Sequence, residues 1–300
     1  MSILPSSLTM RAKRLRTKVM IRGFPVYHAR RIYRSRTGKK LRYKNVQDLN
    51  EKLFWLERYW RHPLVARCTD KYLVRDYVAS CGFGVLLNEL YGVYDTPDAI
   101  DFDALPDQFV LKCNHGCGYN LFCTDKGSFD TEEARGQLRT WMGETYGRES
   151  AEWHYAGIKR KILAERFIPH EEYGSMDYQI YCFNGSPAFF LARNDRGGKL
   201  PLGGSHTYSL DWQQRLPHRT DEDLLKQDFK EPAYREAMIE CAEALSRPFP
   251  LVRVDFYGLD DIVVFGELTF SPIANVLDSY RPEVVAELGR WLKLPPKYQG

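Results

Sequence analysis

The chain has 300 residues, with 43 Lys and Arg against 39 Asp and Glu, and 44% of its residues are hydrophobic. An apolar fraction of this size excludes a chain that is disordered throughout, and no apolar run reaches the roughly 18 residues that a membrane-spanning helix needs. The length is typical of about two domains or subdomains.

Two features of the sequence predict a cytoplasmic protein. The first ten residues are largely polar and include Pro5, and a basic cluster follows them, whereas a secretory signal has the opposite order. The seven cysteines are odd in number and contain no Cys-x-x-Cys pair. This usage favours reduced thiols over a disulfide framework.

Residues 1–44 form a basic amino-terminal arm. Residues 1–47 contain 14 Lys and Arg and no Asp or Glu, although the whole chain carries only four more basic than acidic residues. Such an arm either docks on an anionic partner or lies on the acidic body of the protein. Among anionic partners we favour a peripheral contact with the inner face of the membrane or an acidic glycan. No nucleic-acid recognition motif accompanies the charge. Apolar residues lie between the basic residues of the arm, which predicts that part of the arm packs against the rest of the protein.

Further along the chain, apolar spacing and turn residues predict α+β layers. Asp48 lies near the start of the first helix, Asp70 is a candidate N-cap of the second, and Gly82 lies at its end. The predicted helices cover residues 46–60, 70–82, 132–146, 232–246 and 283–292. The predicted strands cover residues 85–87, 109–114, 162–168, 178–184, 188–193, 251–257 and 262–268, and residues 196–223 are predicted to be loop.

The last two predicted strands carry the richest polar pattern in the chain. Side chains alternate along a strand, so one face of the first strand carries Arg253, Asp255 and Tyr257. On the second strand the same alternation predicts a shared face for Val263, Phe265, Glu267 and Thr269.

With a turn near Asp261, Asp255 lies about opposite Glu267. Directly opposed side chains have Cβ atoms about 5 Å apart, where two like charges repel. Both strands are otherwise apolar, so either one carboxyl is protonated or a cation lies between them. Oxygen ligands on adjacent strands suit Mg²⁺, which is normally shared with substrate phosphates. The alternative is that Arg253 or another base neutralises the pair.

A second cluster places Lys112 on a strand that opens into the glycine turn of FVLKCNHGCGYN. Glycines such as Gly116 and Gly118 allow backbone N–H groups to approach a phosphate, and the lysine adds a positive charge. An ordinary β-turn is the alternative, because the pattern is not a Walker P-loop. Lys71 next to Asp70, taken alone, is typical of a solvated lysine beside a helix cap.

Other residues near this turn are expected to be structural. His115 is a conceivable catalytic base, but a turn histidine is the expected role. Three cysteines around the same strand are better explained as small core residues than as zinc ligands: Cys113, Cys117 and Cys123.

Taken together, these segments resemble the ATP-grasp superfamily, most closely its TupA-like group, over roughly residues 40–292. The segments that carry the resemblance, in the family's order, are TGKKLRYKNVQDLNEKLFWL, DKYLVRDYV, LPDQFVLKCNHGCGYN, ERFI, DYQIYCFNG, LVRVDFY and FGELTFSP. The resemblance implies an α+β ATP-grasp fold with ATP between two subdomains. Residues 45–108 would precede the small subdomain, 109–168, and the large metal-binding subdomain would cover 169–300.

The resemblance also implies roles in binding ATP. Lys71 and Lys112 would contact phosphates, and the turn with Gly116 and Gly118 would close over them. Residues 165–168 match the hinge whose backbone reads adenine, and an acid shortly after the hinge would hold the ribose. The implied residues of this second group are Glu165, Phe167, Ile168 and Glu171 or Glu172.

The core resembles the D-alanine–D-alanine ligase pattern Arg-x-Asp … Glu-x-Asn-Thr-x-Pro-Gly. Arg253 would lie near the transferred phosphoryl group and, with Lys112, would be catalytic, while Asp255 and Glu267 would bind Mg²⁺. Thr269 stands at the Asn position and is a poorer metal ligand. Two further positions depart from the expected residues, with Ile273 in place of glycine and Gln179 in place of lysine.

The resemblance implies a carboxylate–amine ligase that forms an amide through an acyl phosphate, with ATP and Mg²⁺. The substrates would be an amino acid and a uronic acid or similar acidic sugar in cell-surface polysaccharide biosynthesis. Candidates to bind the acidic substrate, with a solvated loop as the alternative for the first three, are Arg193, Arg196, His206 and Asn275.

Three other functions remain open. A phosphotransferase acting on a hydroxyl would use the same ATP site and would release ADP without any amine. A glycosyltransferase of a surface-polysaccharide pathway would bind a nucleotide sugar. A non-catalytic nucleotide-binding protein would explain the departures at Thr269 and Gln179 as loss of activity.

Overall fold

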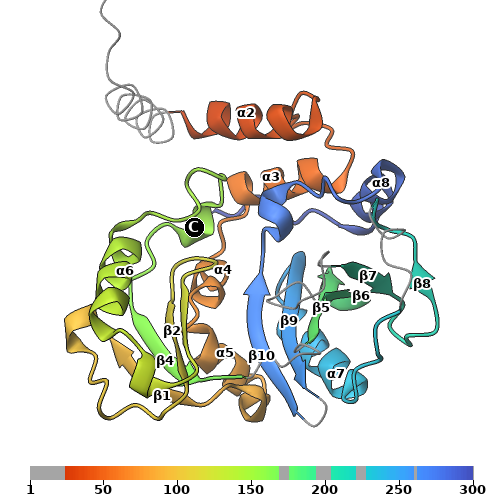
Figure 1. Ribbon diagram of the computed structural model, residues 1–300. Helices are drawn as coiled ribbons and strands as arrows, with labels where there is room; N and C mark the ends of the chain where they lie inside the picture. The colour runs from red at the N-terminus through yellow and green to blue at the C-terminus, as the bar shows by residue number, and fades with distance from the viewer. Residues whose placement is uncertain (1–23, 169–175, 194–203, 221–227, 260–261, 300) are drawn as a thin grey trace, which may run out of the picture.

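The structure is a computed structural model that describes residues 24–168, 176–193, 204–220, 228–259 and 262–299. In this part of the chain, four strands form a small antiparallel sheet and six form a large one. The two sheets lie side by side in Figure 1. Helices pack on both, so the predicted α+β class is confirmed.

The small sheet has the strand order β1–β4–β2–β3. Alternate residues of its inner strands pack against helix α6 (Thr131–Gly143), where Leu138 is fully buried. The intervening residues, among them Lys112 and Glu165, therefore project from the other face of the sheet. The strands are β1 (Leu90–Tyr94), β2 (Phe109–Cys113), β3 (Asn120–Cys123) and β4 (Ile162–Arg166).

The large sheet has the order β10–β9–β5–β6–β7–β8. Its strands are β5 (Met176–Phe183), β6 (Ser186–Arg193), β7 (Ser205–Tyr208), β8 (Arg215–Leu216), β9 (Leu251–Leu259) and β10 (Ile262–Thr269). One face packs on α4 (Pro63–Thr69), α5 (Val74–Ser80) and α7 (Arg235–Ser246). The other packs on α3 (Leu49–Tyr59) and α8 (Pro282–Trp291).

Short 3-10 turns join these elements. They are η1 (Gly84–Leu86), η2 (Pro97–Ala99), η3 (Lys126–Ser128), η4 (Trp153–Tyr155) and η6 (Pro272–Asn275). Within the described residues, no helix is both long enough and apolar enough to cross a membrane.

The described part of the basic arm contains helix α2 (Pro25–Thr37), which lies next to α3 in Figure 1. Ala29 and Tyr33 are buried in a cluster with Phe54 of α3. The expectation that part of the arm packs is therefore confirmed for these residues. The helix leaves other side chains exposed, including Phe24 at 65% and Tyr27 at 58%.

The two predicted helix starts have different outcomes. The Asp48 carboxylate accepts a hydrogen bond from the Glu51 backbone N–H at 2.9 Å and caps α3, as a residue near a helix start should. The prediction that Asp70 is the N-cap of the second helix is wrong, because Asp70 is the C-cap of α4 and Leu73 is the N-cap of α5. The Asp70 carboxylate instead accepts bonds from the Tyr72 N–H at 2.8 Å and the Asn114 amide at 2.9 Å.

Three segments differ from the sequence prediction. The strand predicted over residues 85–87 is wrong: the first two of these residues belong to η1, Val85 is 88% exposed, and Leu87 makes an isolated bridge with Phe265. The predicted loop over residues 196–223 contains β7 and β8, and β1 was not predicted. The short polar sequence of β7 lacks the apolar alternation that signals a strand.

The register of the β9–β10 hairpin contains a bulge at Gly266. Phe265 pairs with Phe256, but Glu267 pairs with Asp255, so one residue of β10 has no partner. Asp255 thus lies opposite Glu267 as predicted. The prediction that Phe265 and Glu267 share a face is wrong, because the extra residue turns them to opposite sides of the sheet.

Candidate active site

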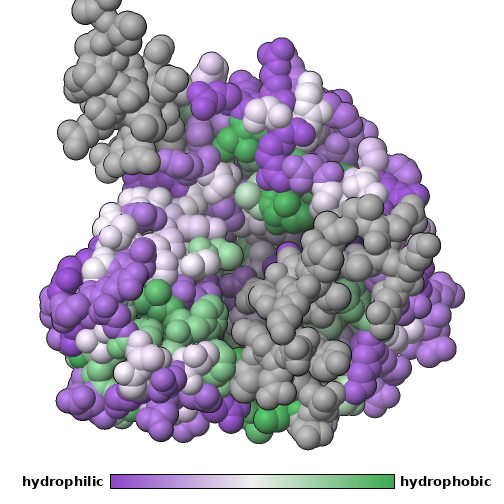
Figure 2. Space-filling model, in the orientation of Figure 1, coloured by the Kyte–Doolittle hydropathy of each residue, from purple (hydrophilic) through white to green (hydrophobic). Residues whose placement is uncertain are grey.

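A cavity of about 550 Å³ lies between the two sheets. Its walls come from α5 and the residues before it, the glycine turn, both inner strands of the small sheet and the β9–β10 hairpin. The charged residues that line it are Lys71, Arg75, Lys112, Glu165 and Glu267. On this side of the molecule the surface is mainly hydrophilic, and apolar residues form separate small patches (Figure 2).

The small-sheet wall carries a carboxylate held by two cations. Lys112 Nζ lies 2.9 Å from Glu165 Oε2, and Arg75 Nη1 lies 3.4 Å from Glu165 Oε1. Burial alone would raise the pKa of Glu165, but the Lys112 ammonium and then the Arg75 guanidinium outweigh burial and lower it. Lys112 and Arg75 therefore line the cavity beside an ionised carboxylate.

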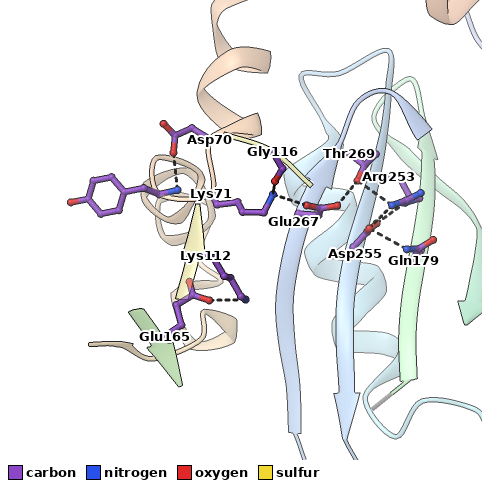
Figure 3. A network of polar contacts seen from close by, with 11 residues as sticks. Asp70, Lys71, Lys112, Gly116, Glu165, Gln179, Arg253, Asp255, Glu267 and Thr269 are labelled. Carbon is purple, nitrogen blue, oxygen red and sulfur yellow. Dashed lines mark hydrogen bonds and ion pairs between the residues drawn. The ribbon is translucent and has the colours of Figure 1, made fainter. Parts of the chain in front are cut away.

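Lys71, which precedes α5, connects the glycine turn to the wall of the cavity formed by the large sheet. Its Nζ donates to the Gly116 carbonyl oxygen at 2.9 Å and lies 3.1 Å from Glu267 Oε2 (Figure 3). Burial alone would lower the pKa of Lys71, but the Glu267 carboxylate raises it overall. Lys71 is therefore not a solvated lysine beside a helix cap.

From Glu267 the polar contacts continue along the hairpin (Figure 3). The Thr269 hydroxyl donates to Glu267 Oε1 at 3.3 Å and accepts from Arg253 Nη2 at 3.2 Å. Arg253 also binds Asp255 with two nitrogens, at 2.7 Å and 2.5 Å. The Gln179 amide donates to Asp255 Oδ2 at 3.2 Å from the neighbouring strand β5.

The facing carboxylates are thus neutralised by side chains of the protein. Arg253 is paired with Asp255, and Lys71 with Glu267, so each acid has a cation of its own. The Asp255 carboxylate raises the pKa of Arg253 well above its ordinary value despite burial, and the guanidinium stays charged. Of the alternatives left open by the sequence, neutralisation by Arg253 is the arrangement seen here.

The same residues fit magnesium by the chemistry of their donors. Asp255 and Glu267 offer carboxylate oxygens and Thr269 a hydroxyl, the hard oxygen donors that Mg²⁺ prefers. The three are linked by hydrogen bonds through Arg253. Glu267 faces the cavity with 26% of its side chain exposed, whereas Asp255 is enclosed by Arg253 and Gln179.

The glycine turn fits closely against aromatic rings. A Cβ on Gly116 would lie 2.6 Å from the Tyr119 ring, and Gly118 has a left-handed φ of +77° that favours glycine. Cys117 between them is exposed and lines the cavity, so its prediction as a core residue is wrong, while Cys113 and Cys123 are buried as predicted.

His115 has a structural environment in this turn. Its Nε2 lies 3.1 Å from the Trp141 carbonyl oxygen, and its ring packs on Tyr119. Burial lowers the pKa of His115, so the imidazole is neutral at physiological pH. These contacts fit the structural role expected for His115.

A smaller cavity adjoins the first at the end of β4. Phe167 and Ile168 line it together with Lys112 and Tyr257. Two residues of the expected adenine hinge thus lie beside the part of the main cavity that Lys112 lines. Glu171 and Glu172, expected at the ribose, lie outside the described residues.

The predicted substrate residues are not brought together. Arg193 is the cross-strand partner of Asp177, which in turn lies opposite Tyr257. Arg193 therefore lies on the same face of the sheet as Asp255. His206 is fully buried against Phe229 on the opposite face. Neither lines the main cavity, and Arg196 lies outside the described residues.

Asn275, the fourth candidate, ends a strained turn. Ile273, Ala274 and Asn275 have φ values of 51°, 50° and 67°, a left-handed conformation that costs about 1–2 kcal/mol for a residue other than glycine. Asn275 is fully buried, and neither its amide nitrogen nor its amide oxygen has a hydrogen-bond partner in the described structure. A buried amide left unpaired adds about 1–3 kcal/mol to the cost of this turn.

Sequence reasoning missed several residues of the cavity. Arg75 follows Lys71 by four residues, a spacing that places both on one side of a helical segment. Gln179 was treated only as a missing charge, although it contacts Asp255. No motif pointed to Asn88 or Asn120, which line the cavity from a loop and from β3.

Comparison with known proteins identifies a family for most of the chain. The model of the TupA-like ATP-grasp family matches residues 51–293. No curated protein matches the chain.

Solved structures with a similar fold include several ligases and synthetases. D-alanine–D-alanine ligase from Bacillus anthracis is 15% identical with a TM-score of 0.41, over 68% of this chain and 57% of that one. D-cycloserine synthetase is 18% identical with a TM-score of 0.43, over 77% and 72%. The Helicobacter pylori D-alanine–D-alanine ligase is 15% identical with a TM-score of 0.41, over 77% and 60%. The chain spans less than two thirds of the length of these two D-alanine–D-alanine ligases.

Proposed function

The chain belongs to the TupA-like ATP-grasp family, and from that premise we propose that it is an ATP-dependent ligase that joins a carboxylate to an amine. The observation that carries the proposal is the continuous set of polar contacts from Lys71 through Glu267, Thr269 and Arg253 to Asp255. The predicted ATP-grasp fold is confirmed by this family membership. The residue ranges 109–168 and 169–300 remain our proposal for its two subdomains.

The proposed reaction has two steps. A carboxylate oxygen of the substrate attacks the γ-phosphorus of ATP, and ADP leaves as an acyl phosphate forms. The amine nitrogen then attacks the acyl carbon, the C–O bond to phosphate breaks, and an amide forms with loss of a proton. Such chemistry requires positioning and charge neutralisation more than a protein nucleophile.

We propose that ATP lies in the cavity between the two sheets. Lys71, Lys112 and Arg75 give this cavity three positive charges near Gly118, whose turn offers backbone N–H groups. We place the adenine ring at the end of the main cavity that adjoins Phe167 and Ile168. These cations would balance part of the phosphate charge.

Asp255, Glu267 and Thr269 would hold Mg²⁺ when it is bound together with ATP. The ion supplies neutralisation of the phosphate oxygens. Lys71 and Arg253 are the cations that pair with these acids in this structure, and both are suited to contact the transferred phosphoryl group. Arg253 is the proposed catalytic residue on this wall, and Lys112 on the other.

The finer substrate proposal is an amino acid and a uronic acid or a similar acidic sugar of a cell-surface polysaccharide. It is supported by the resemblance and by the basic arm, which suits anionic glycans or a membrane surface. Arg193 and Asn275 stay candidates for contact with the acidic substrate. A location at the inner face of the membrane stays part of the same proposal.

The test is a screen of ADP release across pairs of amino acids and uronic acids with Mg²⁺. We expect release to require both an acid and an amine, and Asp255→Asn to reduce it by at least about 100-fold. The matched control is Asp98→Asn, an exposed residue on η2 paired with Arg139, which should leave release unchanged.

Two outcomes would contradict the proposal. Undiminished turnover in Asp255→Asn would show that the hairpin is not the reaction centre. ADP release without any amine, with a stable phosphorylated product, would indicate a phosphotransferase instead.

A further inference from the structure

The turn that follows β10 is contacted by the amino-terminal helix, from more than 230 residues away in sequence. Arg36, in the last turn of α2, donates from Nη1 to the Ile273 carbonyl oxygen at 2.8 Å and from Nη2 to the Val276 carbonyl oxygen at 3.0 Å. Its Nε and Nη2 also donate to Asp278 Oδ2, at 2.9 Å and 2.7 Å. One planar guanidinium thus contacts three residues across a six-residue segment.

These contacts fall on the most strained backbone of the described chain. Ile273, Ala274 and Asn275 are three consecutive residues with left-handed φ, and Ile273 is β-branched. Such a conformation persists only where the surrounding structure holds it. The carbonyl oxygens that Arg36 contacts belong to the first of these residues and to the residue directly after the last.

Other contacts hold the two ends of the segment. The Ser271 hydroxyl donates to the buried Glu152 carboxylate and lies 3.4 Å from His154 Nε2. At the far end, the Leu277 N–H donates to Asn50 Oδ1 of α3 at 2.9 Å. Arg36 is the contact that spans the strained residues between these two anchors.

The segment is directly joined to the proposed site. Thr269, which contacts both Glu267 and Arg253, is only four residues before Ile273. A shift of the turn would therefore move the end of β10 and the hydroxyl at the proposed metal position.

We propose that α2 is part of the active-site architecture, and that Arg36 is a positioning residue that holds the turn 272–278, and with it Thr269 at the end of β10, in the conformation that the proposed ligase reaction requires. The catalytic half of this inference rests on the proposed ligase function. The structural half, that Arg36 maintains the turn, does not. Helix α2, which the sequence assigned to a separate basic arm, thus contacts a segment that adjoins the proposed active site.

The test compares Arg36→Met and Arg36→Lys with Arg31→Met, an exposed residue of the same helix. Hydrogen exchange of the full-length chain is followed at the Val276 and Leu277 amides. We expect exchange there to rise about tenfold or more in both Arg36 variants, because a lysine ammonium cannot replace the planar fork. Asp278→Asn, which keeps the carbonyl contacts, should give a smaller rise.

Activity and nucleotide binding are measured on the same variants. We expect kcat/KM for the carboxylate substrate to fall by about 10- to 100-fold in Arg36→Met, and the Kd for Mg·ATP from calorimetry to rise with it, because Thr269 stands at the proposed metal position. Arg31→Met should match the wild type in all three measurements.

The outcomes separate this inference from the proposed function. Exchange at Val276 and Leu277 that is the same in Arg36→Met and Arg31→Met would overturn it, whatever the activity. Faster exchange with unchanged kcat/KM would overturn the positioning role. A wild-type chain that neither binds Mg·ATP nor turns over would contradict the ligase proposal, and the exchange comparison would still decide whether Arg36 holds the turn.

Discussion

Glu165 shows how one side chain of the cavity wall serves both charge balance and folding. It is 7% exposed and pairs with Lys112 and Arg75, which come from a neighbouring strand and from α5. Removing one partner of a buried ion pair leaves the other charges uncompensated, and the penalty exceeds the value of the pair itself.

We therefore predict that Glu165→Gln destabilises the protein by about 3 kcal/mol at neutral pH. The folded-state pKa of Glu165 is below its ordinary value of 4.5, so its contribution is present above pH 4.5 and is lost as the pH falls through the folded-state pKa. Denaturant unfolding of both proteins between pH 7 and pH 3 checks this. The difference in the free energy of unfolding between wild type and Glu165→Gln should shrink only in acid. The free energy of unfolding of the exposed control, Glu89→Gln, should stay within about 0.5 kcal/mol of wild type throughout. A difference that does not depend on pH would contradict the ion-pair explanation.

The sequence predicts individual polar residues of the site well where alternation along a strand decides their direction. Asp255 was predicted on the same strand face as Arg253, and the two side chains meet there. Residues that join the site from another element could not be assigned in this way. Arg75 depends on how α5 packs against β4, and Gln179 on how β5 pairs with β9, which a local pattern does not contain.

At the scale of single elements, helices were predictable because caps and apolar spacing act locally. The helix after Asp48 and the helix around Leu288 were found within a few residues of their observed bounds. The face of β10 was mispredicted because a bulge changes which residues point inward. An isolated glycine within a strand pattern is a signal for a bulge, and Gly266 is such a residue.

The packing of α8 on α3 depends on a helix position without a side chain. A Cβ on Gly289 would lie 2.7 Å from the Leu49 backbone nitrogen and 2.8 Å from two backbone atoms of Asp48. We predict that Gly289→Ala destabilises the fold by about 1–3 kcal/mol through overpacking. Thermal or denaturant unfolding of the purified variant measures the effect.

Gly136 of α6 provides the matched control, because a Cβ there would meet no atom within 4 Å. Gly136→Ala should leave stability unchanged or raise it by up to about 1 kcal/mol through helix propensity. Equal effects of the two substitutions would contradict close packing of α8 on α3 as the cause.

At the scale of the whole molecule, charge is segregated. The residues from Phe24 to Gln47 include eight Lys and Arg and no acid, and α2 turns Arg31 and Arg34 outward together with Tyr27. Aromatic rings beside exposed bases suit the interface of an anionic membrane, where each basic residue contributes about 1 kcal/mol.

We predict that the full chain co-sediments with vesicles that contain phosphatidylglycerol, and less so as salt is raised. Arg31→Glu combined with Arg34→Glu should weaken this binding by at least about tenfold. The control, Lys159→Glu with Arg247→Glu, makes the same change of net charge at two exposed positions away from α2. Binding that is equal in both double variants, or absent from anionic vesicles, would contradict a membrane contact through this helix.

The single unpaired glycine in β10 has a consequence for how this hairpin can change. The glycine reverses the alternation of side chains along β10. Odd-numbered residues face the apolar cluster beside α4, α5 and α7 before position 266, and even-numbered residues face it afterwards. If Gly266 were instead paired in a regular ladder, Glu267 and Leu268 would exchange sides, which would send a carboxylate into the hydrocarbon interior and a leucine to the reaction cavity. The bulge therefore decides which side chains of β10 reach the cavity, and deletion of Gly266 alone would remove the bulge and leave Glu267 opposite Asp255.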